Sequence, residues 1–166
     1  MNILFLGNCI SLIGCLIMVA VGFLKKKPHI LIVQCVQCAF MGSANLILGG
    51  ISGFTCNMIS LVRNAVFVKH KPSVPLKLCF IALQILFSLA TLGSGLITFL
   101  PIIAASLFTW NMDTPSTARL KVVIIIITMI LWLTYDLHFH NYVAATFDIM
   151  TIASNLIGLH MLKKGT

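Results

Sequence analysis

The sequence predicts an all-α membrane protein that crosses the bilayer seven times. Its 166 residues are 60% hydrophobic and only 8% charged, with a mean hydropathy of +1.09, whereas soluble proteins carry about 25% charged residues. The lysines and arginines behind the net charge of +8 separate apolar runs and form no continuous basic face, as membrane topology signals do. The second and third apolar runs also align with the sixth and seventh at a constant offset along the chain. These observations exclude a soluble enzyme, a nucleic-acid-binding protein and a disordered regulator.

Each predicted span is an apolar run close to the roughly 17–25 residues that a membrane helix needs. The runs are residues 3–24, 29–48, 51–68, 78–92, 95–110, 122–137 and 142–162. Lysine clusters follow the first, third and seventh runs, and Gly49 and Gly50 end the second. Because the positive charges follow the first run instead of preceding it, we expect a membrane span there and not a cleaved signal peptide.

The fourth and fifth spans come from one stretch, residues 78–112, that contains no charged residue. A single helix of this length would measure about 52 Å, far more than the ~30 Å hydrocarbon core. Residues 92–95, Leu-Gly-Ser-Gly, supply a turn that divides it into two helices. With this division, every lysine and arginine outside the apolar runs falls on one side of the membrane. The charge bias predicts an outside N-terminus and a cytoplasmic C-terminus.

An offset of 91 residues aligns the second and third spans with the sixth and seventh without a gap. Residues 54–64, FTCNMISLVRN, fall on residues 145–155, ATFDIMTIASN, and the first span falls on the fifth. Parallel repeats of this kind are typical of transporters. The predicted organisation is a three-helix repeat over residues 1–72, a linker helix over 73–93 and a second three-helix repeat over 94–166.

Polar side chains on the third and seventh spans form the main candidate substrate site. Three residues spaced by three and four positions share one helical face on each span, and the offset superposes the two sets. They are Asn57, Ser60 and Asn64, and Asp148, Thr151 and Asn155. Amides and hydroxyls there supply donors and acceptors for a polar solute, although such groups also serve as hydrogen bonds between membrane helices.

Three further side chains on the second and sixth spans are predicted to line the same cavity. They are Gln37, Trp132 and Tyr135. The two aromatic residues lie about one helical turn apart, so they could stack against a ring or a sugar face. The alternative for Tyr135 is an aromatic anchor at the outer membrane interface.

Asp148 is the only carboxylate well inside a predicted span. Loss of hydration at that depth disfavours its charged form, which is the physical basis for a proton-coupling role. The alternatives are an ion pair with Arg63 or a water-filled vestibule. Arg63 lies nearer the cytoplasmic end of its span, where its long side chain could reach the membrane surface.

The remaining motifs do not indicate catalysis, a metal site or a cofactor. Asp136, His138 and His140 fall in the predicted outer loop before the seventh span, where we expect them to be solvated. The six cysteines all lie in apolar runs, as small packing residues do. No phosphate-binding glycine loop, zinc-protease motif or serine-hydrolase motif occurs. We therefore expect no enzyme activity, no metal, no cofactor and no nucleic-acid partner.

The arrangement of three, one and three helices resembles that of the MtN3/PQ-loop superfamily, which includes the SWEET sugar carriers and the PnuC-type vitamin carriers. More narrowly, residues 44–69, ANLILGGISGFTCNMISLVRNAVFVK, and residues 131–163, LWLTYDLHFHNYVAATFDIMTIASNLIGLHMLK, are similar to segments of the bacterial YgjV-type inner-membrane proteins. The chain contains no Pro-Gln dipeptide. The resemblance implies a substrate-binding position on the third helix of each triplet, either Asn57 with Asp148 or Asn64 with Asn155.

The resulting hypothesis is a multi-pass permease of the bacterial inner membrane. It would take one small polar solute between two three-helix bundles that alternate access to the two sides, with the lipid bilayer as its surroundings. Proton coupling and homo-oligomerisation are both compatible with the sequence. The alternative is a structural or accessory membrane protein that transports nothing.

Overall fold

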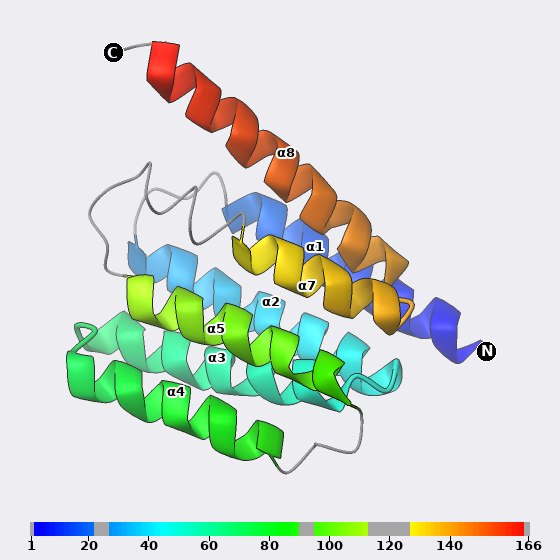
Figure 1. Ribbon diagram of the computed structural model, residues 1–166, viewed down its shortest axis with the longest axis horizontal. Coiled ribbons are helices and arrows are strands. Elements are labelled where there is room, and N and C mark those ends of the chain that lie inside the picture. Colours follow the sequence, from blue (N-terminus) through cyan, green and yellow to red (C-terminus); the bar gives the residue numbers. More distant parts are fainter. Residues whose placement is uncertain (1, 22–26, 90–94, 113–126, 165–166) are drawn as a thin grey trace.

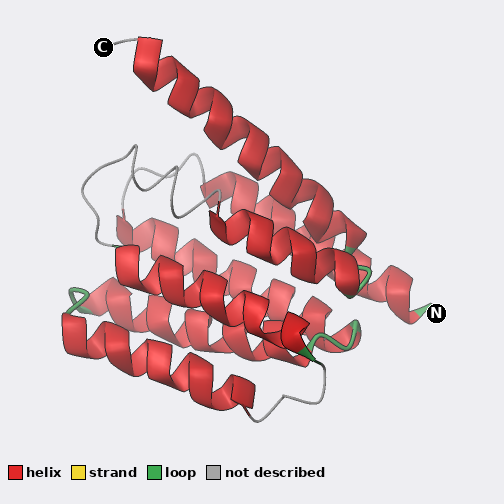
Figure 2. Cartoon of the chain, viewed as in Figure 1, coloured by secondary structure: helices red, strands yellow, loops and turns green. Residues whose placement is uncertain are grey.

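The structure, a computed structural model, describes residues 2–21, 27–89, 95–112 and 127–164. Throughout these residues the protein is helical with short connecting turns (Figures 1 and 2). Seven α-helices are described, in agreement with the all-α prediction. They are α1 (Ile3–Val21), α2 (Lys27–Ile47), α3 (Ile51–Lys69), α4 (Val74–Leu89), α5 (Phe99–Asn111), α7 (Ile127–His138) and α8 (Tyr142–Lys164), with a short 3-10 helix, η2 (Leu96–Thr98), before α5.

The long uncharged stretch forms two helices, as the sequence predicts. Helix α4 ends at Leu89 and η2 begins at Leu96. Gly95, just before η2, has a φ of 77°, a backbone conformation that favours glycine. The rest of the predicted turn, residues 92–94, lies outside the described residues, as does the first part of the sixth predicted span, residues 122–126.

The main contacts between helices close a ring. Helix α1 contacts α2, α2 contacts α3, α3 contacts α5, α5 contacts α7, α7 contacts α8, and α8 returns to α1. Helix α4 lies outside this ring and packs on α3 and α5 (Figure 1). Asn8 joins the first and last helices, because its Nδ2 donates to His140 O at 3.1 Å and its Oδ1 accepts from Val143 N at 3.1 Å.

The two tight hairpin turns have the same backbone geometry, one 91 residues after the other. Gly49, between α2 and α3, has a φ of 84°, and His140, between α7 and α8, has a φ of 57°. Both turns lie at the end of the bundle that also holds the N-terminal end of α1, because Asn8 reaches His140. The lysines that begin α2 and end α3 and α8 lie at the opposite end (Figure 1).

The distribution of polar and apolar side chains between interior and surface is the reverse of that in a water-soluble protein. Large apolar side chains are exposed on every described α-helix, and Leu96 in η2 has 85% of its surface exposed. The buried set is rich in polar residues: Ser11, Asn45, Ser52, Asn57, Ser60, Arg63, Asn64, Lys77, Gln84, Thr98, Thr109, Thr128, Asp136 and Asn141. In lipid, apolar side chains face outward and polar ones face the interior, so this distribution agrees with a membrane protein.

Among the described residues, one helix is long and apolar enough by itself to cross a membrane. It is α3, with 19 residues and a mean hydropathy of 1.3. Five shorter apolar segments accompany it: Ile3–Met18, Leu31–Ile47, Val74–Phe87, Leu96–Asn111 and Tyr142–Ala153.

Candidate functional site

Arg63 lies in the bundle interior between α3 and α5. Only 3% of its surface is exposed, so the expectation that its side chain reaches the membrane surface is wrong. Its Nη1 donates to Thr109 Oγ1 at 2.7 Å, and its Nε and Nη2 donate to Asn64 Oδ1 at 3.2 and 3.0 Å. The guanidinium carbon is 5.2 Å from the centre of the Phe108 ring, a cation–π distance. These partners on two helices hold the cation inside the bundle.

Asp136 is a second charged residue in the interior, and the prediction that it is solvated in the outer loop is wrong. It lies in the last turn of α7, which ends at His138, and is only 2% exposed. Its Oδ1 accepts a hydrogen bond from Asn141 Nδ2 at 3.3 Å. His138 and His140 are exposed. No group of three potential metal ligands occurs among the residues that the structure describes.

Asp148 lies in the second turn of α8 and has one unpaired carboxylate oxygen. Its Oδ2 is buried and has no hydrogen-bond partner. The carboxylate is within electrostatic reach of Asp136 on α7 and of Cys15 on α1. Among the described residues no ion pair joins Asp148 to Arg63, which was one alternative raised by the sequence. Helices α7 and α8 therefore bring two carboxylates within electrostatic reach of each other, and α1 places Cys15 within reach of both.

Tyr135 is fully buried where α7 packs against the first turn of α3. Its hydroxyl oxygen accepts hydrogen bonds from Gly53 N at 2.7 Å and from Ser52 Oγ at 3.1 Å. A Cβ atom at Gly53 would lie 2.8 Å from this oxygen, so the close approach of the helices requires glycine there. Trp132 contacts the Tyr135 ring edge to face, with 5.8 Å between ring centres. Tyr135 is thus an interior residue that connects α7 to α3, and not an exposed interfacial anchor.

The other predicted site residues bond mainly within their own helices. Asn57 Nδ2 donates to Gly53 O at 2.8 Å, and Thr151 Oγ1 donates to Phe147 O at 2.8 Å. Gln37 Oε1 accepts from Cys38 Sγ at 3.6 Å. Ser60 is buried in α3, and the side chain of Asn155 lies outside the described residues.

Several interior polar residues were not selected from the sequence. Among them, both amide atoms of Asn45, the hydroxyl of Ser11 and the hydroxyl of Thr98 are buried without a hydrogen-bond partner. These side chains come from α2, α1 and η2 and are completely buried. The sequence held one signal for this set, since the 91-residue offset superposes Asn45 on Asp136.

A comparison with models of protein families identifies the family of this chain. The family model Imp-YgjV, described as a bacterial inner membrane protein, matches residues 5–165. The chain belongs to this family. The match includes every described helix almost completely, and it agrees with the apolar exterior of the bundle. Comparisons with the curated proteins and with the solved structures found no match.

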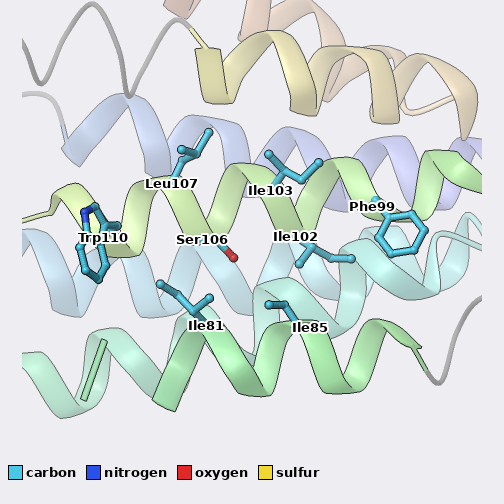
Figure 3. A pocket seen from close by; sticks show the side chains of 8 residues that line it. All are labelled: Ile81, Ile85, Phe99, Ile102, Ile103, Ser106, Leu107 and Trp110. Atoms are coloured by element: carbon cyan, nitrogen blue, oxygen red, sulfur yellow. The ribbon is translucent and has the colours of Figure 1, made fainter. Parts of the chain in front are cut away.

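In this YgjV-family protein, an open groove of about 430 Å³ lies between α4 and α5 (Figure 3). It is lined by Ile81, Ile85, Phe99, Ile102, Ile103, Ser106, Leu107 and Trp110. Its lining contains none of the predicted site residues and only one hydroxyl group, so it suits an apolar occupant such as a lipid chain rather than a polar solute.

The interior of the YgjV-family bundle is polarised along its length. Asp136 lies in the last turn of α7 and Asp148 in the second turn of α8, near the end of the bundle that holds the hairpin turns. Arg63 is 12 residues into α3, toward the opposite end. At 1.5 Å per residue, Arg63 lies about 9 Å further along its helix from the hairpin end than Asp148 does along α8. The interior can therefore offer a cationic contact and an anionic contact at different depths.

Proposed function

We propose that this YgjV-family protein is a small-solute permease of the MtN3/PQ-loop type. The observation that carries the proposal is the set of charged and unpaired polar groups inside a bundle whose exterior is apolar. Charged side chains within a membrane are costly, and they commonly line the pathways of solutes and ions. Arg63, Asp136 and Asp148 are such groups, and the unpaired Asp148 Oδ2 leaves an acceptor for a solute or a proton.

The proposal includes two parallel three-helix repeats joined by a linker helix, α4. Helix α1 corresponds to α5, α2 to α7 and α3 to α8. Under this correspondence the contacts of α1 with α2 and of α2 with α3 have counterparts in α5 with α7 and α7 with α8. The contact of α1 with α8 likewise has its counterpart in α5 with α3. This symmetry and the matching hairpin turns support a twofold relation about an axis along the membrane normal.

In the proposed mechanism, the two repeats rock against each other and expose the solute to each side in turn. The polar faces of α3 and α8, which carry Asn57 and Asp148 at corresponding positions, contact the solute. Asp148 takes up and releases a proton during the cycle through its unpaired oxygen. The lysine-rich end of the bundle faces the cytoplasm, so the N-terminus is outside.

A second candidate function is that of a structural or accessory inner-membrane protein. It is favoured by the hydrogen bonds that join helices, since Tyr135 connects α7 to α3 and Arg63 connects α3 to α5. Membrane bundles commonly use polar groups in this way. In that case the polar interior holds the helices together and transports no solute.

The first test is ligand binding by the purified protein in detergent. A panel of nucleosides, vitamins, sugars, amino acids and hydroxy acids is screened for an increase in Tm, because a ligand that binds only the native state stabilises it by mass action. Uptake of any hit is then measured in proteoliposomes.

Three variants separate the two candidate functions. The permease predicts a hit whose uptake is lost in Asn57→Leu and in Asp148→Asn while both variants still insert and fold. Thr146→Ala, on the exposed side of α8, is the matched control and retains uptake. Absence of any hit and of any uptake would contradict the permease and favour the structural function.

A further inference from the structure

Arg63 carries a positive charge in the interior with no anionic partner among the described residues. Its hydrogen-bond acceptors, Asn64 Oδ1 and Thr109 Oγ1, are neutral. The groups that interact with it electrostatically are the thiols of Cys35, Cys38 and Cys56, none of which is a carboxylate. A buried charge without a counter-charge is costly, and a ligand of opposite charge removes this cost.

We propose that Arg63 binds an oxyanion, so that the solute of this YgjV-family protein carries a carboxylate or a phosphate group. The inference rests on the proposed permease function and specifies the chemical class of its substrate. A guanidinium group matches the planar or tetrahedral arrangement of oxygen atoms in both groups and binds them through paired hydrogen bonds.

The guanidinium is already positioned for such a ligand. Asn64 holds the Nε side, Thr109 holds Nη1 from the neighbouring helix, and Phe108 lies within cation–π distance. A guanidinium has five N–H groups, and the hydrogen bonds to Asn64 and Thr109 use three of them. Two N–H groups are therefore left for an oxyanion, and the side chain loses little further freedom on binding.

The carboxylates of the interior are at another depth and do not neutralise Arg63. Asp148 is six residues into α8, whereas Arg63 is 12 residues into α3, so Arg63 is about 9 Å further along its helix from the end where both helices begin. An acidic solute can thus meet the cation without direct contact with Asp148, and any cationic or hydroxyl group elsewhere on the solute can face the carboxylates.

The test compares anions with their uncharged analogues. Acetate, lactate and succinate are each paired with the corresponding amide, and inorganic phosphate is tested separately. Binding to the purified protein is measured by Tm shift and by isothermal titration. We expect at least one anion to bind while its amide does not, and the carboxylate and phosphate arms distinguish the two sources of the oxyanion.

Variants then assign the binding to Arg63. Arg63→Gln is expected to weaken the Kd of that anion by about 30-fold or more, as removal of one partner of a buried charged pair does. Arg63→Lys keeps the charge but loses the planar fork, so it is expected to fall between wild type and Arg63→Gln, and it supplies the test if Arg63→Gln does not fold. Thr146→Ala, on the exposed side of α8, is the matched control and is expected to leave Kd unchanged.

The outcomes separate this inference from the proposed function. Binding and uptake of a neutral solute that Arg63→Gln leaves unchanged would overturn the oxyanion site while the permease stands. Absence of binding and uptake for every class would overturn both. Asp113 is the one acidic residue of the sequence that lies outside the described residues, and Asp113→Asn tests whether the chain itself supplies the counter-charge. If this variant lowers Tm as much as Arg63→Gln does and wild type binds no anion, Arg63 is a structural residue.

Discussion

The two hairpins, α2–α3 and α7–α8, have the same backbone geometry at their turns but carry different side chains there. In the first, Gly50 N donates to Asn45 O at 2.7 Å; in the second, Asn141 N donates to Asp136 O at 2.8 Å. The φ angle is positive at the same position of both turns. The two turns therefore have the same backbone geometry, and the chemistry at each turn depends on the side chains that it carries.

The side chains make the first hairpin neutral at its turn and the second acidic. Asn45 is buried with both amide atoms unpaired, whereas its counterpart Asp136 is held by Asn141. Gly50, the counterpart of Asn141, leaves space that the Tyr135 hydroxyl fills, since a Cβ atom at Gly50 would lie 2.6 Å from that oxygen. The difference shows how one backbone geometry can serve two roles: one hairpin receives the Tyr135 hydroxyl of the neighbouring helix, and the other carries an acid.

The strongest way to break the first hairpin is to add a side chain at Gly53. In Gly53→Val, the Cβ atom alone would meet Tyr135 Cε1 at 2.7 Å and Asn45 Nδ2 at 2.8 Å, and helices α3 and α7 would have to separate. Overpacking of this kind costs about 1–3 kcal/mol, and we expect the upper end because the bond from Gly53 N to Tyr135 is also lost. The measurement is thermal unfolding in detergent.

Gly49→Asn is the control for that variant. Nothing lies within 4 Å of a Cβ atom at Gly49, and asparagine tolerates a positive φ better than other residues do. A decrease in Tm as large as that of Gly53→Val would mean that the turn, and not the contact with Tyr135, limits stability.

The second prediction removes the hydroxyl that joins the two hairpins. Tyr135→Phe leaves the buried N–H of Gly53 and the hydroxyl of Ser52 without this acceptor, and an unsatisfied buried polar group costs about 1–3 kcal/mol. We expect a loss of stability in the lower part of that range, because the ring and its packing remain. Tyr142→Phe is the matched control, since its hydroxyl contacts the exposed His140 Nδ1 and its loss should leave Tm nearly unchanged.

The third prediction makes the second hairpin resemble the first in charge. In Asp136→Asn, Oδ1 can still accept the bond from Asn141 Nδ2, so the stability of the fold should change by less than about 1 kcal/mol. If the carboxylate takes part in transport, uptake falls while Tm is kept. A large decrease in Tm would instead identify the charge of Asp136 as a structural requirement.

The smallest expected effect comes from copying the glycine of the first turn into the second. His140 adopts a φ of 57°, which is strained for a side chain other than glycine. His140→Gly relieves this strain but increases the freedom of the unfolded chain, so we expect a net gain of at most about 1 kcal/mol in unfolding measurements. A clear loss would mean that the contact of His140 with Tyr142 outweighs the strain.

The sequence predicts the helices well because apolar length, glycine and charge punctuation are local properties. The division between α4 and α5, for example, follows from a stretch too long for one span. The burial of Arg63 and Asp136 could not be predicted in this way. It depends on partners distant in the sequence, such as Thr109 on α5, and on the packing of α7 against α5 and α8. The proximity of Asp136 and Asp148 likewise arises only when α7 and α8 pack together.

The central claim, that the polar interior is a solute pathway, is tested most directly by thiol accessibility. Cys15 is buried near Asp148, whereas Cys79 is exposed on α4, on the apolar exterior. Variants that retain only one of these cysteines are treated in membranes with a charged, membrane-impermeant methanethiosulfonate reagent. The permease predicts that Cys15 reacts, because the interior opens to water during the cycle, and that Cys79 in lipid does not. A folded protein in which Cys15 stays unreactive from both sides of the membrane would contradict the account.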